Sequence, residues 1–228
     1  MNAIPAVSRV RWKPSYRLIP SRFPPIGIYD RVADPADLEA VLAIENMTDP
    51  RMRQEAGDIS LVPTEDRISG KGTTPIMSAF THLNPEGSRF SDGSYGVYYA
   101  SRTLDTAITE TRHQRERFLG RTREAPIEID MRAILANIDA RLHDIRGRIG
   151  LKDIYDSDSY AAGQALGRRL RAMNSYGIAY DSVRRPGGEC IGIFRPPALK
   201  DCVEGAHYCY VWDGAKITTV YEKKIVAR

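Results

Sequence analysis

The sequence has little of what redox, metal-binding and membrane proteins need. Its three cysteines are odd in number and lack CxxC spacing, which argues against a disulfide framework or a zinc site. The four histidines form no HExxH pattern, so no metal is expected. No apolar run reaches the roughly 18 residues of a membrane span, and residues 1–10 lack the apolar region of a signal peptide. We therefore expect a cytoplasmic protein with no membrane contact.

Two common nucleotide-binding motifs are also missing, since the chain has neither a GxGxxG fingerprint nor a Walker A sequence. The net charge is +4, and arginines gather at residues 112–123 and 168–171. Such patches can bind nucleic acid or an acidic partner, or they can be solvated helix faces. Glu116 interrupts the first patch and Glu124 closes it, so we favour solvated faces over nucleic-acid binding and keep an acidic substrate open.

The size and composition are those of one soluble domain. With 228 residues, 42% of them hydrophobic, the chain is long enough for a substantial core. Residues 50–75 are rich in Gly, Thr and charge and show little periodicity. We expect a single domain over residues 1–228, with an N-terminal extension and a long inserted loop or lid at about residues 50–86.

Local patterns predict strands mixed irregularly with helices, which favours an α+β fold. Asp34 and Pro35 predict a helix start, and Leu38, Val41 and Leu42 form its apolar stripe. A second helix is predicted over residues 160–173. The predicted strands cover residues 17–19, 96–100, 127–129, 178–180, 190–194, 209–212 and 217–221.

The most informative segment is Gly87–His113. A short aromatic and β-branched strand, Gly96–Ala100, leads into a helix for which Thr103 is a plausible N-cap. The apolar stripe of this helix has helical spacing and comprises Leu104, Ala107, Ile108 and Thr111. Glu110 lies on the flank of that stripe, which places a carboxylate at the rim of a packed face.

These residues resemble the RES family, toxins of bacterial toxin–antitoxin pairs named for an arginine, a glutamate and a serine. The family pattern runs Y-R near the N-terminus, then G-x-R-F/W, I/L/V-Y-x-A, A-x-x-E and a late Y/P-x-S-x-R. This chain has, in the same order, Tyr16–Arg17, Gly87–Phe90, Val97–Ala100, Ala107–Glu110 and Tyr180–Arg184. Each element is short, but the ordered set is fairly specific. The segment Ser21–Pro25 resembles one longer subgroup.

The resemblance implies an ADP-ribosyltransferase-like fold, with a core of twisted β-sheets and flanking helices around a cleft for NAD. The reaction would cleave the N-glycosidic bond between nicotinamide and ribose, which builds oxocarbenium-like charge on the ribose. Glu110 is the candidate carboxylate that stabilises this charge and accepts a hydrogen bond from the ribose 2-OH. The alternative is an exposed helix glutamate without a chemical role.

The resemblance also assigns two residues of the N-terminal half. Side chains alternate along a strand, so only one of Tyr98 and Tyr99 can reach the cleft, and the family alignment favours Tyr98 as the ring that stacks on nicotinamide. The other possibility is that Tyr98 is an ordinary core residue. Arg17 would bind a phosphate or the ribose side of NAD, with Arg22 as a rival for that role.

The remaining candidates are Arg89, His82 and Ser182. Arg89 could clamp an anion, or it could pair with Asp92 to hold its loop. His82 is a weak candidate near the cleft, because a lone histidine is more often structural. Ser182 would hydrogen-bond Glu110 or the ribose, and no motif-linked base marks it as a nucleophile.

Several activities remain open. The first is a mono-ADP-ribosyltransferase toxin acting on a protein acceptor, possibly a nucleotide-synthesis enzyme such as phosphoribosyl pyrophosphate synthetase. The second is an NAD glycohydrolase or phosphorylase that depletes NAD. A basic RNA-directed toxin and a non-catalytic binding module are further alternatives. The resemblance implies a cognate antitoxin with a helix-turn-helix domain as the partner.

Overall fold

The computed structural model describes residues 4–20, 27–32, 34–48, 56–148, 150–224 and 226. Arg22, the segment 21–25 and residues 50–55 of the predicted insert lie outside these ranges. The helices are α1 (Leu38–Thr48), α3 (Thr74–Thr81), α4 (Leu104–Thr122) and α5 (Ala161–Ala172). The strands are β1 (Val7–Pro20), β2 (Tyr98–Ser101), β3 (Ile127–Asp144), β4 (Gly177–Asp181), β5 (Glu189–Ile193), β6 (Leu199–Trp212) and β7 (Ile217–Lys223).

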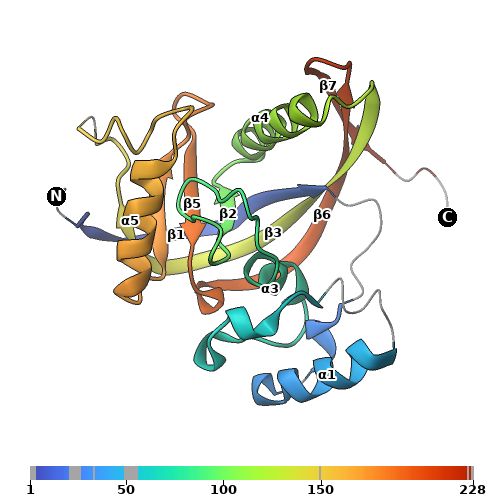
Figure 1. Cartoon of the computed structure of the whole chain (residues 1–228), viewed down its shortest axis with the longest axis vertical. Coiled ribbons are helices and arrows are strands. Elements are labelled where there is room, and N and C mark those ends of the chain that lie inside the picture. Colours follow the sequence, from blue (N-terminus) through green and yellow to red (C-terminus); the bar gives the residue numbers. More distant parts are fainter. Residues whose placement is uncertain are drawn as a thin grey trace.

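The fold is α+β, with one large twisted sheet and flanking helices, as the sequence pattern predicts (Figure 1). The strand order is β1-β2-β5-β4-β3-β6-β7, and β1 also pairs with β3. Strands β1, β2, β5, β4 and β3 therefore form a closed ring of pairings. Strand β6 pairs with β3 along the edge opposite β1, and β7 pairs with β6. Helix α4 packs against β1 and β2, above the point where the ring meets this extension.

The strands β1 and β3 are much longer than their predicted cores. In β1, Val10 and Trp12 are buried, while Arg9 and Arg11 are exposed and both donate to Asp139 of β3. This alternation of apolar and charged residues is typical of a strand with one solvated face. Long antiparallel pairing holds such polar stretches in the sheet, and local hydrophobicity does not reveal them.

The predicted helix starts are confirmed. The Asp34 carboxylate accepts from the Ala36 amide at 2.9 Å, in a short 3-10 turn (Pro35–Asp37) that leads into α1. Thr103 accepts from the Thr106 amide at 3.3 Å and begins α4. Both caps satisfy amide groups that have no partner inside the helix.

The segment predicted as a loop at residues 50–86 is in part a folded piece of the core. It contains α3 and two 3-10 turns, Ile59–Leu61 and Thr64–Asp66. Ile76, Met77 and Phe80 of α3 are all buried in the main core cluster. Helix α3 has only eight residues, so its apolar pattern is too short to stand out among the glycines and charged residues around it.

Two glycines bring α5 against the turn that contains the G-x-R-F element. A Cβ on Gly163 would lie 2.3 Å from the carbonyl oxygen of Arg89, and one on Gly167 would lie 2.1 Å from that of Phe90. No other residue permits so close an approach of helix and backbone. The helix therefore fixes the position of Arg89.

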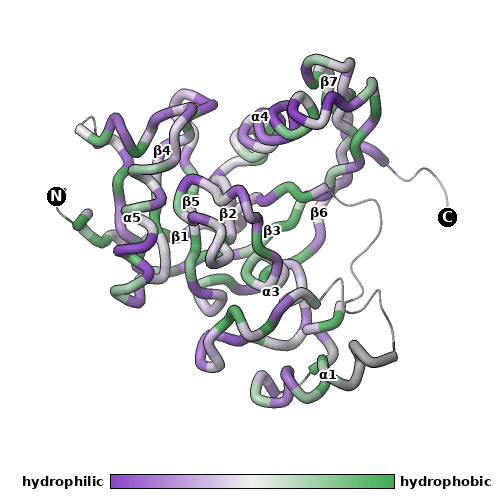
Figure 2. Tube along the Cα trace, in the orientation of Figure 1, coloured by the Kyte–Doolittle hydropathy of each residue, from purple (hydrophilic) through white to green (hydrophobic). Residues whose placement is uncertain are grey.

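Helix α4 is largely hydrophilic (Figure 2). Its buried residues are Thr106, Ala107 and Leu119, so it packs on the sheet through a narrow stripe. The rest of its surface is available to solvent or to a ligand. No helix among the described residues is long and apolar enough to cross a membrane.

Candidate active site

A cleft of about 930 Å³ runs along α4. Residues from β1, α3, β2 and the 84–91 turn form its other walls. On α4 the lining extends from Ala107 to Arg121, which is about 21 Å at the 1.5 Å rise of an α-helix. The volume lies in the range of cofactor sites, and the length suits an extended ligand.

Glu110 and Ser182, 72 residues apart in the sequence, meet in the structure. The Ser182 Oγ donates to the Glu110 Oε1 at 2.5 Å and accepts from the backbone amides of Arg184 at 3.2 Å and Arg185 at 2.9 Å. Those amides occupy the acceptor side of the hydroxyl, so its proton points to the carboxylate. Glu110 is partly buried and lines the cleft, so one carboxylate oxygen is oriented while the group remains accessible.

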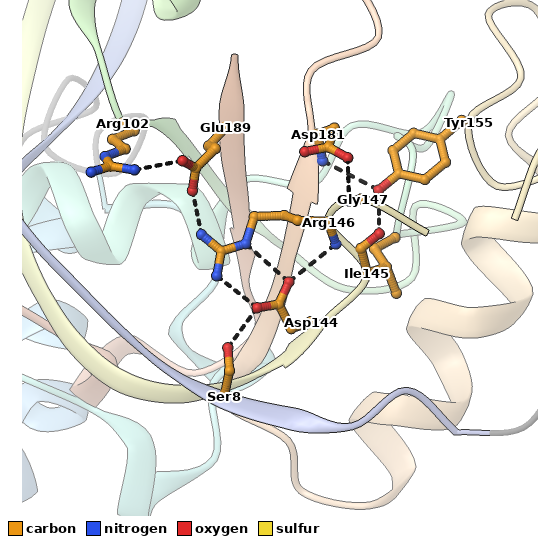
Figure 3. Close-up of polar contacts among 9 residues, drawn as sticks. All are labelled: Ser8, Arg102, Asp144, Ile145, Arg146, Gly147, Tyr155, Asp181 and Glu189. Carbon is orange, nitrogen blue, oxygen red and sulfur yellow. Dashed lines mark hydrogen bonds and ion pairs between the residues drawn. The ribbon is translucent and has the colours of Figure 1, made fainter. Parts of the chain in front are cut away.

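The turn that contains Ser182 spans residues 182–188 and is closed by the Ser182 amide donating to the Gly188 carbonyl at 2.8 Å. We call it the Ser182 turn. Figure 3 shows the contacts at its two ends. Asp181 accepts from the Gly147 amide at 2.7 Å, and its own amide donates to the Tyr155 hydroxyl at 3.2 Å. These bonds fix the entry to the turn.

At the exit of the turn, Glu189 joins an ion-pair network (Figure 3). Arg146 donates to Glu189 and, through Nε at 2.9 Å and Nη2 at 2.6 Å, to Asp144. Ser8 of β1 also donates to Asp144 at 2.6 Å, and Arg102 donates to Glu189 at 2.5 Å. The Arg146 hydrogen bonds lower the pKa of Asp144 to about 2. Both ends of the Ser182 turn are therefore anchored to the sheet.

Arg17 lines the cleft from β1, and its Nη1 donates to the Tyr99 carbonyl at 3.2 Å. Its guanidinium carbon lies 4.9 Å from the centre of the Tyr98 ring. Burial lowers the pKa of Arg17, and its Nε has no hydrogen-bond partner among the described residues. A partly desolvated guanidinium with unused donors is suited to hold an anion or an oxygen-rich ligand.

The tyrosine of β2 that faces the cleft is Tyr99, not Tyr98 as predicted. Tyr98 is fully buried in the main core cluster, and its ring supports Arg17 instead of facing the cleft. Tyr99 lines the cleft, where its hydroxyl accepts from the Phe90 amide at 2.9 Å and hydrogen-bonds the Ser88 Oγ at 2.8 Å. The alternation along β2 was predicted, but the packing of α3 against the strand decides which face is the core.

Arg89 and His82 both line the cleft. The Arg89 Nη1 donates to the carbonyls of Ile154 at 2.7 Å and Asp156 at 2.9 Å. The alternative pairing of Arg89 with Asp92 is wrong, because Asp92 binds Arg168 at 2.8 Å. His82 is exposed, and its Nδ1 lies 3.1 Å from the Ser78 carbonyl of its own helix. The two hydrogen bonds hold the Arg89 guanidinium in the wall of the cleft, whereas the exposed His82 lies at its rim.

Part of the 112–123 patch borders the cleft. Arg115, Arg117 and Arg121 line the cleft, together with Arg184. Arg117 and Arg121 follow Glu110 by seven and eleven positions, which is two and three helical turns. That spacing could have placed them on the face of Glu110. The ring of Tyr160, at the start of α5, lines the cleft beside them and was not predicted as a site residue.

Within the described residues, no three His, Cys, Asp or Glu side chains are grouped as a metal site would require. The polar groups that line the cleft include the carboxylate of Glu110, serine and tyrosine hydroxyls and several arginines. A carboxylate beside a row of guanidinium groups suits a substrate that develops positive charge at one end and has anionic groups at the other.

The family model and the sequence relative support the motif resemblance. A sequence model described as "RES domain" matches residues 64–213, which include Glu110 and Ser182 but not Arg17. The uncharacterized protein y4oC of Sinorhizobium fredii is 34% identical over 213 residues, covering 90% of this chain and 86% of that protein. The crystal structure of the M. tuberculosis MbcT–MbcA toxin–antitoxin complex aligns over 86% of both chains, with 11% identity and a TM-score of 0.41. The match to the RES domain covers well over half of the chain, and the chain therefore belongs to the RES domain family.

Proposed function

We propose that this protein is the toxin of a toxin–antitoxin pair, which cleaves NAD at the nicotinamide–ribose bond and transfers ADP-ribose to a protein acceptor. The acceptor we propose is an enzyme of nucleotide synthesis. The observation that carries the proposal is the hydrogen bond from Ser182 to Glu110 within a long, arginine-lined cleft. Membership of the RES domain family supports it independently.

In the proposed reaction the C–N bond breaks, nicotinamide leaves with the bonding electron pair, and positive charge develops on the ribose. The Glu110 carboxylate stabilises that charge with the oxygen that Ser182 does not bind. A nucleophile of the acceptor then attacks the anomeric carbon and loses its proton. Because Ser182 already holds Glu110 in place, little reorganisation accompanies the development of charge.

Arg17 and Tyr99 complete the proposed site. Arg17 is fixed by the Tyr99 carbonyl and the Tyr98 ring, and it would hold the ribose side of the substrate with its remaining N–H groups. We assign the stacking role to Tyr99, because it is the tyrosine of β2 that lines the cleft. Tyr98 then acts through Arg17 as a positioning residue.

The proposed partner is a cognate antitoxin with a helix-turn-helix domain. The simplest neutralisation is insertion of a segment of the antitoxin into the cleft, which would exclude NAD. Mixing the purified pair and measuring NAD turnover against antitoxin concentration would test this step.

The decisive experiment uses NAD labelled in its adenylate part, with the purified protein alone and with cell lysate. Label on a protein band supports transfer. Soluble ADP-ribose or its phosphate would instead assign the protein as an NAD-degrading glycohydrolase or phosphorylase. NAD that remains intact in both conditions, with a correctly folded protein, would contradict both reactions.

Expression in bacteria provides a second test. We expect growth arrest when the protein is produced without the antitoxin, and no arrest with Glu110→Gln. If protein modification is the cause, growth stops while most NAD remains, since acceptor molecules are far fewer than NAD molecules. A collapse of NAD before the arrest would favour degradation, and arrest that survives Glu110→Gln would contradict any NAD-based mechanism and favour an RNA-directed toxin.

A further inference from the structure

Three guanidinium groups converge on one end of the cleft without a carboxylate partner. They belong to Arg89, Arg117 and Arg184, which all line the cleft. In the described part of the chain, none of the three forms an ion pair with an Asp or Glu. Three cations grouped in a cleft repel each other, and a bound anion would offset this repulsion.

All three groups are held by one short segment, residues 154–160. Arg89 donates to two of its carbonyls, those of Ile154 and Asp156, and Arg184 donates to the Ser157 carbonyl at 2.7 Å. The guanidinium carbons of Arg89 and Arg117 lie 4.9 and 5.4 Å from the centre of the Tyr160 ring. Neutral carbonyls and an aromatic face orient these cations without neutralising them.

The supporting segment is itself fixed. The Tyr155 hydroxyl donates to the Ile145 carbonyl at 2.8 Å and accepts from the Asp181 amide, as Figure 3 shows. Tyr160 directly precedes α5, which approaches the Arg89 backbone closely at Gly163. The guanidinium groups are therefore preorganised, which lowers the entropic cost of binding a ligand.

This cluster is adjacent to the proposed reaction centre. Arg184 follows Ser182 by two positions in the same turn, and Arg117 is two helical turns beyond Glu110 on α4, about 10 Å along the helix axis. His113 lies between them, and burial, followed by the positive charge of Arg184, lowers its pKa. The charge of the cluster is thus felt close to Glu110.

We propose that Arg89, Arg117 and Arg184, supported by Tyr160, form a subsite for the diphosphate group of the substrate. A planar guanidinium binds phosphate oxygens through paired hydrogen bonds, and three of them match a diphosphate with charge to spare. The proposal rests on the proposed function, since it concerns the same cleft and a dinucleotide substrate. It moves the phosphate-binding role from Arg17 to this cluster and leaves Arg17 on the ribose side.

Calorimetric titration of the whole protein with ADP, AMP and adenosine tests the subsite without any turnover. We expect ADP to bind more tightly than AMP and adenosine to bind weakly. Arg117→Gln and Arg184→Gln should each weaken ADP binding about tenfold or more, the usual loss for a hydrogen bond to a charged group, and leave adenosine binding unchanged. Arg112→Gln is the matched control, because it removes the same charge from α4 at an exposed position that does not line the cleft.

The support from Tyr160 has its own test. Tyr160→Phe keeps the ring and should bind ADP within about twofold of the wild type, whereas Tyr160→Leu should lose about as much affinity as Arg117→Gln, because the cation–π contact is gone. Equal affinity in the Phe and Leu variants would remove Tyr160 from the subsite. Circular dichroism of each variant establishes that the fold is intact.

The proposal would be overturned if the wild type did not bind ADP, or if neither arginine variant weakened ADP binding. A loss of ADP affinity of the same size in Arg112→Gln would also overturn it. So would an RNA preference, in which Arg117→Gln and Arg184→Gln weaken the binding of a short single-stranded RNA more than they weaken the binding of ADP. Failure of the proposed function is distinguishable. If NAD is never cleaved but ADP binding depends on the cluster, the subsite stands and the reaction falls. If Glu110→Gln abolishes turnover while the arginine variants bind ADP normally, the reaction stands and the subsite falls.

Discussion

Arg146 lies at the base of the Ser182 turn between two carboxylates, whereas Arg117 lies in the cleft against an aromatic ring. Arg146 donates to both Asp144 and Glu189, so its charge is neutralised by ion pairs within the protein. Arg117 contacts the ring of Tyr160. The same residue type thus has a structural role in one region and is left available for a ligand in the other. The difference teaches that the partner of an arginine, more than its exposure, indicates its task.

The largest expected effect concerns Glu110, the carboxylate that Ser182 binds. Glu110→Gln keeps the size of the side chain and one oxygen that can accept from Ser182, but it removes the charge. We expect turnover of NAD to fall on the order of 100- to 1,000-fold, with ADP affinity and unfolding temperature unchanged. Single-turnover kinetics with purified protein provide the measurement. Turnover within a few-fold of the wild type would show that another group carries the charge stabilisation.

The next effect separates the two arginines by stability. Arg146→Gln leaves Asp144 and Glu189 close together without their common cation, so we expect the free energy of unfolding to fall by about 2 kcal/mol. Arg117→Gln should change it by less than about 0.5 kcal/mol, because no carboxylate depends on Arg117. Urea unfolding of both variants tests the contrast, and equal losses of stability would remove it.

Ser182→Ala tests the link between the anchored turn and the catalytic carboxylate. The substitution removes the hydroxyl that holds Glu110 and the acceptor of two backbone amides. We expect about a tenfold lower rate with the carboxylate still present, which is the usual value of one hydrogen bond to a charged group. Ser182→Thr retains the hydroxyl and should recover much of the rate. If Ala and Thr variants behave alike, the hydroxyl has no positioning role.

The smallest effect is a dependence on acid. Asp144 has a folded pKa of about 2, below its ordinary 3.8, because Arg146 binds its ionised form. A lowered folded pKa contributes stability that is fully present above the unfolded pKa and is lost as the pH falls towards the folded one. The stability difference between wild type and Arg146→Gln should therefore shrink as the pH falls through this window. A difference that stays constant down to pH 2 would show that Asp144 is not the linked group.

Much of the site was predictable from short motifs in order. The pairing of Glu110 with Ser182 followed from the family resemblance, and the structure places the two side chains in contact. The role of each remains a prediction. The choice of Tyr98 failed, because alternation along a strand says that two neighbouring rings face opposite sides but not which side is the core. The long loop prediction failed in part because the eight residues of α3 are too few for a periodic signal.

Local sequence was sufficient for the helix caps at Asp34 and Thr103 and for the α+β class, because each depends on residues within a few positions of one another. Tertiary structure alone decided which arginines are neutralised and which face the cleft. The partners of Arg146, Arg89 and Arg184 come from distant strands, turns and backbone carbonyls. Such contacts depend on how the strands pair and how α5 approaches the Arg89 turn, and no pattern of neighbouring residues encodes that geometry.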